Sequence, residues 1–259
     1  MPAWNERIRM CHAGAAPQAV RLREPRGSDE LALDGVDTRA AVRWLDALLD
    51  GPPAAAELSA SDRDALLAGV HRALWGDRIV SSFACVACGK MVDLSFELSA
   101  LQRDLAGRTE AAQVGTPRHL RDHEGHAYTL PTAADEEAAA QLGLPQAREA
   151  LAQVIRPGVD AALLAARLEA LAPLLDVDLD AVCAECGQAQ QMRFDIQSFV
   201  LQRLLDERNS LLAEVHALAA AYGWSLAEIT ALPRSLRRAF AARLQAQAQA
   251  QVPRAAAFG

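Results

Sequence analysis

A repeated cysteine motif constrains this chain more than any other feature of its sequence. The pattern Cys-x-x-Cys-Gly occurs twice, 98 positions apart, and its fixed residues are Cys85, Cys88 and Gly89, then Cys183, Cys186 and Gly187. The same displacement also aligns Leu94 with Met192, Phe96 with Phe194, Glu97 with Asp195, Leu98 with Ile196 and Leu101 with Phe199. We therefore predict an internal repeat of a cysteine knuckle (the tight turn that carries one pair), a return strand and a helix.

Two such pairs are predicted to supply the four ligands of one structural zinc ion. Zn²⁺ takes four thiolates in a tetrahedron, and a two-residue gap lets both sulfurs of one turn reach the same ion. The glycine after each second cysteine permits the left-handed backbone of a tight turn. Four thiolates leave no position for a water molecule, so the site is predicted to be non-catalytic. The predicted ligands of this single zinc are Cys85, Cys88, Cys183 and Cys186.

The alternative interpretation is that each pair is a redox dithiol. Thioredoxin-like chemistry places its thiolate at a helix N-terminus, which lowers the pKa of that thiol. Here a strand pattern follows the first pair, because Val92, Leu94, Phe96 and Leu98 alternate with polar residues. We therefore favour the shared zinc. The 94 residues between Cys88 and Cys183 do not prevent it, because the entropy cost of loop closure grows only logarithmically with length.

Composition narrows the class of protein. A hydrophobic fraction of 51% in 259 residues predicts a compact fold. We expect no secretion signal and no membrane span, and hence a cytoplasmic protein. Five cysteines in that compartment indicate metal or free thiol chemistry, which leaves Cys11 without an assigned role. The net charge of −7 disfavours nonspecific binding to nucleic acid.

Helical patterns surround the cysteine motifs. Asp37 or Thr38 can cap a helix that ends near Leu49, and Ser59 or Ser61 can cap the next one. The fold class is therefore mainly α with small β elements, built around a zinc-ribbon-like module. The predicted division is 1–36 without firm structure, 37–77 as N-terminal helices, 78–98 plus 177–196 as the module, 99–176 as a helical insertion with a hairpin, and 197–259 as C-terminal helices.

The carboxyl half carries three further helix signals. A three-four alternation of apolar residues predicts one long helix over 197–222, interrupted only by Arg208, that packs on another helix. Ser225 with Glu228 has the spacing of a capping box. Pro233 can start a last helix.

Residues 119–130 predict a hairpin that turns near residues 122–125. A second metal site there is conceivable, yet exposed hairpin histidines are usually ordinary surface residues. The candidate ligands are His119, His123 and His126 with Asp122 and Glu124. No catalytic triad, phosphate-binding glycine loop or carboxylate pair stands out in the sequence. We therefore expect no enzymatic activity and no small-molecule substrate.

The carboxyl end has a distinctive set of motifs, which we call the carboxyl signature: Glu214-Val215-His216-Ala217-Leu218-Ala219, Tyr222-Gly223-Trp224-Ser225, Glu228-Ile229, Leu232-Pro233-Arg234 and Arg237-Arg238. This signature resembles a known family, the baseplate hub assembly chaperones of T-even-type contractile-tailed phages. Relatives of that family also occur in prophage and contractile injection system loci. The resemblance covers Thr38 to Phe240, whereas the opening residues depart from the pattern. It also takes in Asp62-Arg63-Asp64, Leu66-Leu67, Trp75-Gly76, Leu130-Pro131-Thr132 and both knuckles.

The resemblance implies a role in assembling the baseplate hub, with hub or other tail proteins as partners, and incorporation into the particle is compatible with it. Aromatic anchors and arginine forks are the residue types that bind at interfaces. The candidate partner-binding residues are Tyr222, Trp224, Arg234, Arg237 and Arg238. The arginines are expected to stay accessible. The alternative function is a zinc-ribbon regulator that binds nucleic acid through the terminal arginines, which are these three with Arg243 and Arg254.

Overall fold

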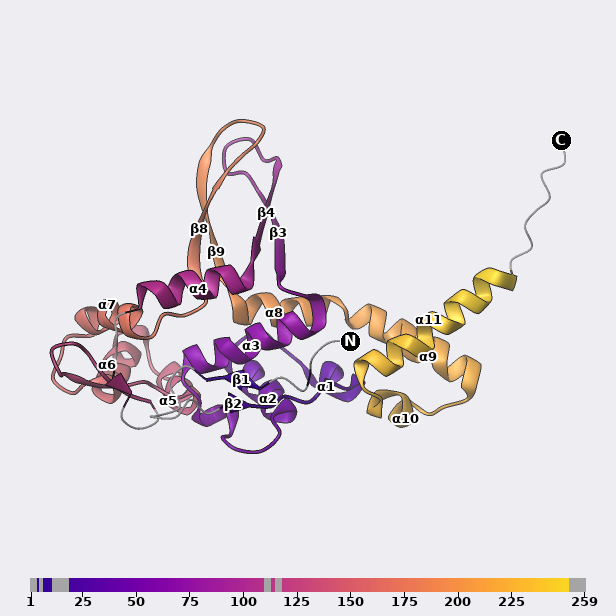
Figure 1. The fold of residues 1–259 in the computed structure, drawn as a ribbon, viewed down its shortest axis with the longest axis horizontal. Coiled ribbons are helices and arrows are strands. Elements are labelled where there is room, and N and C mark those ends of the chain that lie inside the picture. The colour runs from indigo at the N-terminus through magenta and orange to yellow at the C-terminus, as the bar shows by residue number, and fades with distance from the viewer. Residues whose placement is uncertain (1–3, 5–6, 11–18, 110–112, 115–117, 252–259) are drawn as a thin grey trace.

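The computed structural model describes residues 4, 7–10, 19–109, 113–114 and 118–251. It is mainly helical with small antiparallel sheets, which confirms the predicted fold class at that level. Two long hairpins rise side by side from one face of a helical body, and helices extend from both ends of that body (Figure 1). Among the described residues, no helix combines the length and the apolar character needed to cross a membrane.

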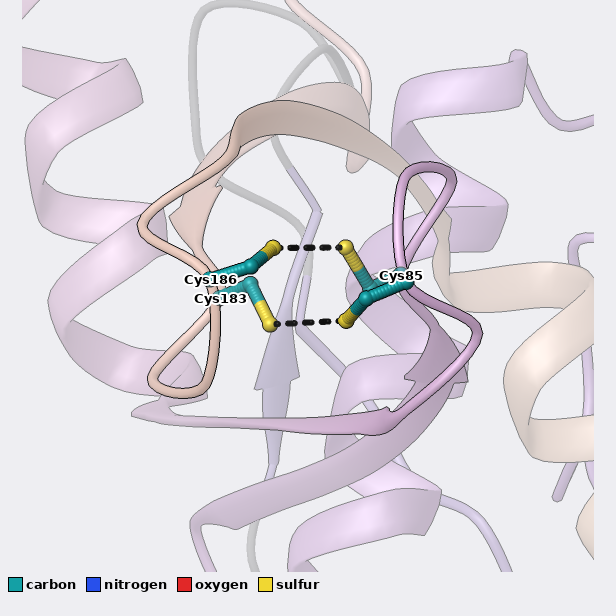
Figure 2. Close-up of side chains that lie close together, drawn as sticks. Cys85, Cys183 and Cys186 are labelled. Atoms are coloured by element: carbon teal, nitrogen blue, oxygen red, sulfur yellow. Dashed lines mark hydrogen bonds between the residues drawn. The ribbon is translucent and has the colours of Figure 1, made fainter.

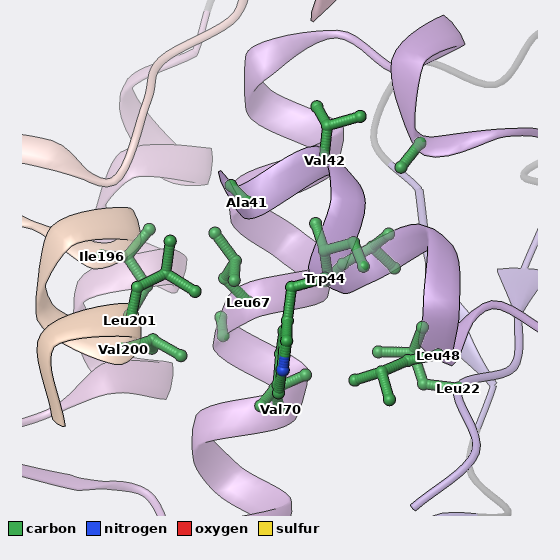
Figure 3. Packing of buried hydrophobic residues seen from close by; sticks show 14 of the residues in the cluster. Leu22, Ala41, Val42, Trp44, Leu48, Leu67, Val70, Ile196, Val200 and Leu201 are labelled. Atoms are coloured by element: carbon green, nitrogen blue, oxygen red, sulfur yellow. The ribbon is translucent and has the colours of Figure 1, made fainter. Parts of the chain in front are cut away.

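The central body is built on three helices. Asp37 accepts a hydrogen bond from the Ala40 N–H at 2.8 Å and caps α2 (Thr38–Leu48), and Ser59 caps α3 (Ala60–Trp75). Helix α8 (Ile196–Asp206) packs against α3. The core lies where these helices meet (Figure 3) and includes Trp44, Leu45, Leu48, Leu66, Leu67, Val70, Val200 and Leu201.

Part of the segment 1–36, for which the sequence predicts no firm structure, belongs to this body. It contains β1 (Ile8–Arg9), β2 (Ala19–Val20) and α1 (Gly27–Ala32). Leu22 and Leu33 are buried in the central core. These elements are too short to produce a readable hydrophobic period. Cys11 lies outside the described residues.

The predicted internal repeat is confirmed in the order and bounds of its elements. The first unit consists of β3 (Arg78–Ala84), β4 (Met91–Glu97) and α4 (Leu98–Arg108). The second consists of β8 (Asp176–Val182), β9 (Ala189–Asp195) and α8. Each bound in the second unit lies 98 positions after its counterpart. We call the two hairpins β3–β4 and β8–β9 the cysteine arms.

The insertion between the two units has its own small core. The predicted hairpin is present as β6 (His119–Arg121) and β7 (Ala127–Thr129). The short strand β5 (Gln113–Val114) pairs with β6 and completes a three-stranded sheet. Three helices follow: α5 (Ala133–Ala140), α6 (Leu144–Ile155) and α7 (Ala161–Leu171). The core consists of Leu120, Tyr128, Leu130, Ala152, Ile155, Leu164, Leu171 and Ala172.

The prediction of one long helix over 197–222 is wrong, because the chain turns at Glu207 between α8 and α9 (Arg208–Tyr222). The turn lets the Glu207 carboxylate accept a hydrogen bond from the Trp75 indole N–H at 2.9 Å. Arg208 donates a hydrogen bond to the Leu31 carbonyl at 3.1 Å, in the last turn of α1. As predicted, α9 packs on another helix, namely α11 (Arg234–Gln251), and α10 (Leu226–Ala231) lies between them in the chain.

Candidate metal centre

Backbone hydrogen bonds build the same tight turn at the tip of each cysteine arm. The Cys85 N–H donates to the Lys90 carbonyl at 2.8 Å, and the Gly89 N–H donates to the Cys85 carbonyl at 2.9 Å. In the second arm, Cys183 and Gly187 make the equivalent bonds at 2.9 Å each. Gly89 has a φ of +68° and Gly187 a φ of +74°, a region that Cβ-bearing residues resist. The motif glycines therefore have the role that the sequence predicts.

The four predicted ligands come together at the arm tips (Figure 2). The sulfurs of Cys85 and Cys186 are 3.7 Å apart, and those of Cys88 and Cys183 are 3.8 Å apart. All four sulfurs lie within 4.8 Å of one another. A tetrahedron with Zn–S bonds of about 2.3 Å has edges of about 3.8 Å, whereas a disulfide bond is about 2.05 Å long. The four free thiols thus form a possible metal site.

The electrostatics of the cluster favour a cation. Backbone N–H groups of Cys88 and Ala87 stabilise the Cys85 thiolate and lower its pKa to about 7. At Cys186 the Gln188 N–H acts in the same direction, but the neighbouring thiols and burial outweigh it and raise the pKa to about 12. One cysteine of the cluster therefore ionises readily, and its negative charge opposes the ionisation of the others. A bound divalent cation would compensate these charges.

The two arms also contact each other below the cysteines. Phe83, Val92 and Ala181 form a small apolar cluster with the buried Cys85 and Cys183. Toward the helical body, the rings of Phe96 and Phe194 meet edge to face with centroids 5.1 Å apart. Cys88 and Cys186 are exposed, so a metal ion can reach the site from the tip. The metal would thus join two arms that already pack together at their base.

Buried hydrogen bonds fasten the arms to the body. The Leu98 N–H donates to the Asp77 carbonyl at 2.9 Å, and the Ile196 N–H donates to the Leu175 carbonyl at 2.9 Å. The second arm has an additional attachment, in which the Leu175 N–H donates to the carboxylate of Asp64 at 2.8 Å. Burial raises the pKa of Asp64 to about 7, although the bond from Leu175 acts against this rise.

This pKa shift predicts a pH dependence of stability. Because Asp64 binds its proton more tightly in the folded state, its contribution is fully present below about pH 3.8 and is lost as the pH rises through about 7. Asp64→Asn keeps an acceptor for Leu175 and removes the titration. We expect the variant to melt at a higher temperature than the natural protein at pH 8, with a smaller difference at pH 5. The exposed Asp50→Asn is the matched control, and equal effects of both variants would contradict the assignment.

The histidine hairpin places Asp122, Glu124 and His126 near one another. The buried Asp122 carboxylate accepts hydrogen bonds from the backbone N–H groups of Glu124 at 3.0 Å and His126 at 2.9 Å, and from the Tyr128 hydroxyl at 3.0 Å. Burial acts to raise the pKa of Asp122, but the bonds from the His126 backbone, the Tyr128 hydroxyl and the His126 side chain outweigh it and lower the pKa to about 2. His119 contacts Thr129 instead. Asp122 thus fixes the turn, as carboxylates in such turns commonly do.

The expectation that the terminal arginines stay accessible is wrong for two of them. The side chain of Arg234 is 3% exposed and that of Arg237 is 1% exposed, whereas Arg238 is 40% exposed. Arg237 pairs with Glu30 at 2.8 Å and with Glu214 at 2.8 Å. Arg234 pairs with the other oxygen of Glu30 at 2.6 Å. Both arginines therefore join the C-terminal helices to α1 and are not available as surface residues.

The structure adds three carboxylates that the sequence does not single out for this network: Glu30, Glu207 and Glu214. Glu207 pairs with Arg234 and with Arg238, the latter at 2.9 Å. Burial acts to raise the pKa of Glu207, but the charge of Arg234 and the bonds from Trp75 and Arg234 lower it. Only the acidic character of these residues was visible in the sequence, because the partners of Arg234 and Arg237 come from distant segments.

The two predicted aromatic anchors lie together at the corner between α9 and α10. Gly223 adopts a left-handed conformation with a φ of +69° and ends α9. The ring of Tyr222 stacks on Trp224 with centroids 4.9 Å apart, and Phe240 of α11 meets Trp224 edge to face at 5.3 Å. Tyr222 is 41% exposed. We call Tyr222, Trp224 and Phe240 the aromatic corner.

The predicted Ser225 and Glu228 capping box is confirmed. The Glu228 N–H donates to the Ser225 hydroxyl at 3.3 Å, and the Ser225 N–H donates to the Glu228 carboxylate at 2.8 Å. Much of the carboxyl signature therefore stabilises the C-terminal helices and their contact with α1. The exposed part of the aromatic corner lies on the surface. No family model matches the sequence, and comparisons with curated proteins and with solved structures find no match.

Proposed function

We propose that the four cysteines bind one structural zinc ion and that the chain acts by binding other proteins, without catalysing a reaction. The observation that carries the metal assignment is the spacing of the sulfurs, 3.7 and 3.8 Å between the two closest pairs, which matches the edges of a zinc-thiolate tetrahedron. All four positions of that tetrahedron would be filled by cysteine. The ion would therefore hold the two repeat units together and would have no open position for a substrate.

We further propose that the protein is an assembly chaperone or component of a contractile-tail baseplate and acts in the bacterial cytoplasm. Support comes from the resemblance of the carboxyl signature to the baseplate hub assembly chaperones. The residues of that signature have two different environments in the fold, buried and exposed. Arg234 and Arg237 are buried ion-pair residues, whereas Tyr222 is 41% exposed and can contact another protein. Leu226, which lies beside the signature in the chain, is 57% exposed. Exposed aromatic and aliphatic residues at a rigid corner suit a binding surface.

The alternative of a nucleic-acid-binding regulator loses two of the arginines on which it relied, whereas Arg243 is exposed. Arg234 and Arg237 are buried against carboxylates and cannot reach a phosphate backbone. Arg238 also pairs with Glu207 and Glu214. The net charge of −7 disfavours the same partner. We therefore retain protein binding as the proposed activity.

Co-purification tests this proposal. We expect the natural protein to retain a hub or tail protein encoded beside it, and Tyr222→Ser with Leu226→Ser to lower that retention at least about tenfold, because interface anchors of this type are each worth more than about 1 kcal/mol. The matched control is Leu144→Ser with Leu163→Ser, which changes two leucines that are each 67% exposed on α6 and α7. If no tail protein is retained, or both double variants behave alike, the proposal is wrong.

A further inference from the structure

A groove of about 760 Å³ lies between the N-terminal strand β1 and the helices α3 and α4. Four arginines line it: Arg7 and Arg9 from the β1 segment, Arg72 from α3 and Arg103 from α4. The apolar part of the lining consists of Trp4, Ile8, Leu22, Ala65, Gly69, Ala73 and Ala106. We call this the arginine groove. It is separate from the cysteine arms and from the aromatic corner.

The charges of these four arginines are not compensated within the described part of the chain. The described residues of the lining include no acidic one, and none of the four arginines forms an ion pair with a described carboxylate. Arg72 donates to the side-chain carbonyl of Gln102, and Arg103 donates to the Ser99 carbonyl at 3.2 Å. Both acceptors are neutral. This is unusual in a chain with a net charge of −7, where carboxylates outnumber cations.

Ile8 of β1 packs its side chain directly on Gly69 of α3. A Cβ atom on Gly69 would lie 2.3 Å from Cδ1 of Ile8, which is far inside van der Waals contact. Arg7 and Arg9 flank Ile8 in the chain and line the same groove as Arg72 and Arg103. Four positive charges that line one groove favour an anion there.

We propose that the arginine groove binds an acidic segment of a partner protein. Guanidinium groups bind carboxylates through paired, charge-assisted hydrogen bonds, and the apolar lining can accept aliphatic side chains between the acidic ones. A nucleic acid offers anions too, but a polymer that continues beyond the groove would meet the acidic remainder of the chain. A short acidic segment would lie within the groove, where it would contact the arginines and the apolar lining without reaching that acidic remainder. Neither the baseplate role nor the metal is required for this binding.

The probe is a fluorescein-labelled peptide of alternating glutamate and leucine, measured by fluorescence anisotropy with the full chain at low salt. We expect binding that weakens as salt is added, because screening reduces the attraction between exposed charges. We expect Arg9→Glu with Arg103→Glu to raise the Kd at least about tenfold, since both arginines are exposed and each reversal replaces an attraction with a repulsion. The milder pair Arg9→Gln with Arg103→Gln is used if the reversal lowers the melting temperature.

The matched control is Arg148→Glu with Arg243→Glu, which makes the same change in net charge at exposed positions on α6 and α11. This control is expected to bind the peptide as the natural protein does. Three results would overturn the proposal: no binding of the peptide, equal binding of a version with glutamine in place of glutamate, or equal loss in both double variants. Tighter binding of a single-stranded DNA oligonucleotide of the same charge would also overturn it and would assign the groove to nucleic acid.

Discussion

Cys88→Ser and Cys186→Ser are each expected to abolish stoichiometric zinc binding and to lower the melting temperature by roughly 10 °C. Serine keeps the size of the side chain but does not supply a thiolate, so three ligands remain. Structural zinc contributes roughly 10 to 16 kcal/mol in small peptides that are unfolded without it. We expect a smaller loss here, because the arms also contact each other through Phe96 and Phe194. A loss of a few kcal/mol corresponds to that temperature shift in a domain of this size.

Metal content and melting are measured on the same preparations. Cys11→Ser is the matched control, because Cys11 is not part of either Cys-x-x-Cys-Gly motif, and it should keep one zinc per chain. Removing the metal with a chelator from the natural protein should reproduce the melting temperature of the two variants. If the natural protein instead contains no metal and carries a reversible disulfide within a Cys-x-x-Cys pair, the redox interpretation would replace the structural zinc.

The cysteine site could be predicted from the sequence because its information is local and duplicated. Each knuckle needs only two cysteines, a glycine and a following strand, and the displacement of 98 positions shows which residues are equivalent. The caps at Asp37, Ser59 and Thr132 are equally local, since each side chain bonds to a backbone N–H three residues later. Such features require no knowledge of the distant parts of the chain.

Features that depend on distant segments could not be predicted. Arg234 and Glu30 are 204 positions apart, and nothing near either residue indicates that they meet. The apolar pattern of α8 continues into α9 with Arg208 as its one polar interruption, so the periodicity does not locate the turn at Glu207. The turn brings Glu207 to Trp75, 132 positions away. The same reason explains why α1 could not be assigned, since its place is set by its contacts with α2, α9 and α10.

Arg237→Ala is expected to destabilise the fold by about 3 to 5 kcal/mol, the range typical of a broken buried ion pair. Its side chain is 1% exposed and that of its partner Glu30 is 5% exposed, so removing the guanidinium leaves a buried carboxylate with one fewer cation. Arg238→Ala is the matched control at the neighbouring position. Because Arg238 is 40% exposed, we expect a loss of less than about 1 kcal/mol. Urea denaturation followed by circular dichroism gives both values.

A double variant separates the lost ion pair from lost packing. Glu30→Gln removes the negative charge, so Arg237→Met with Glu30→Gln should cost less than the sum of the two single changes, with a coupling of more than about 1 kcal/mol. The coupling is not expected to cancel the whole loss, because Glu30 also pairs with Arg234 at 2.6 Å. Strictly additive effects would mean that the ion pair between Arg237 and Glu30 contributes nothing, and that Arg237 stabilises this end of the chain through packing or through its pair with Glu214. Any loss of partner retention in an Arg237 variant must therefore be corrected for unfolding before it is ascribed to a binding surface.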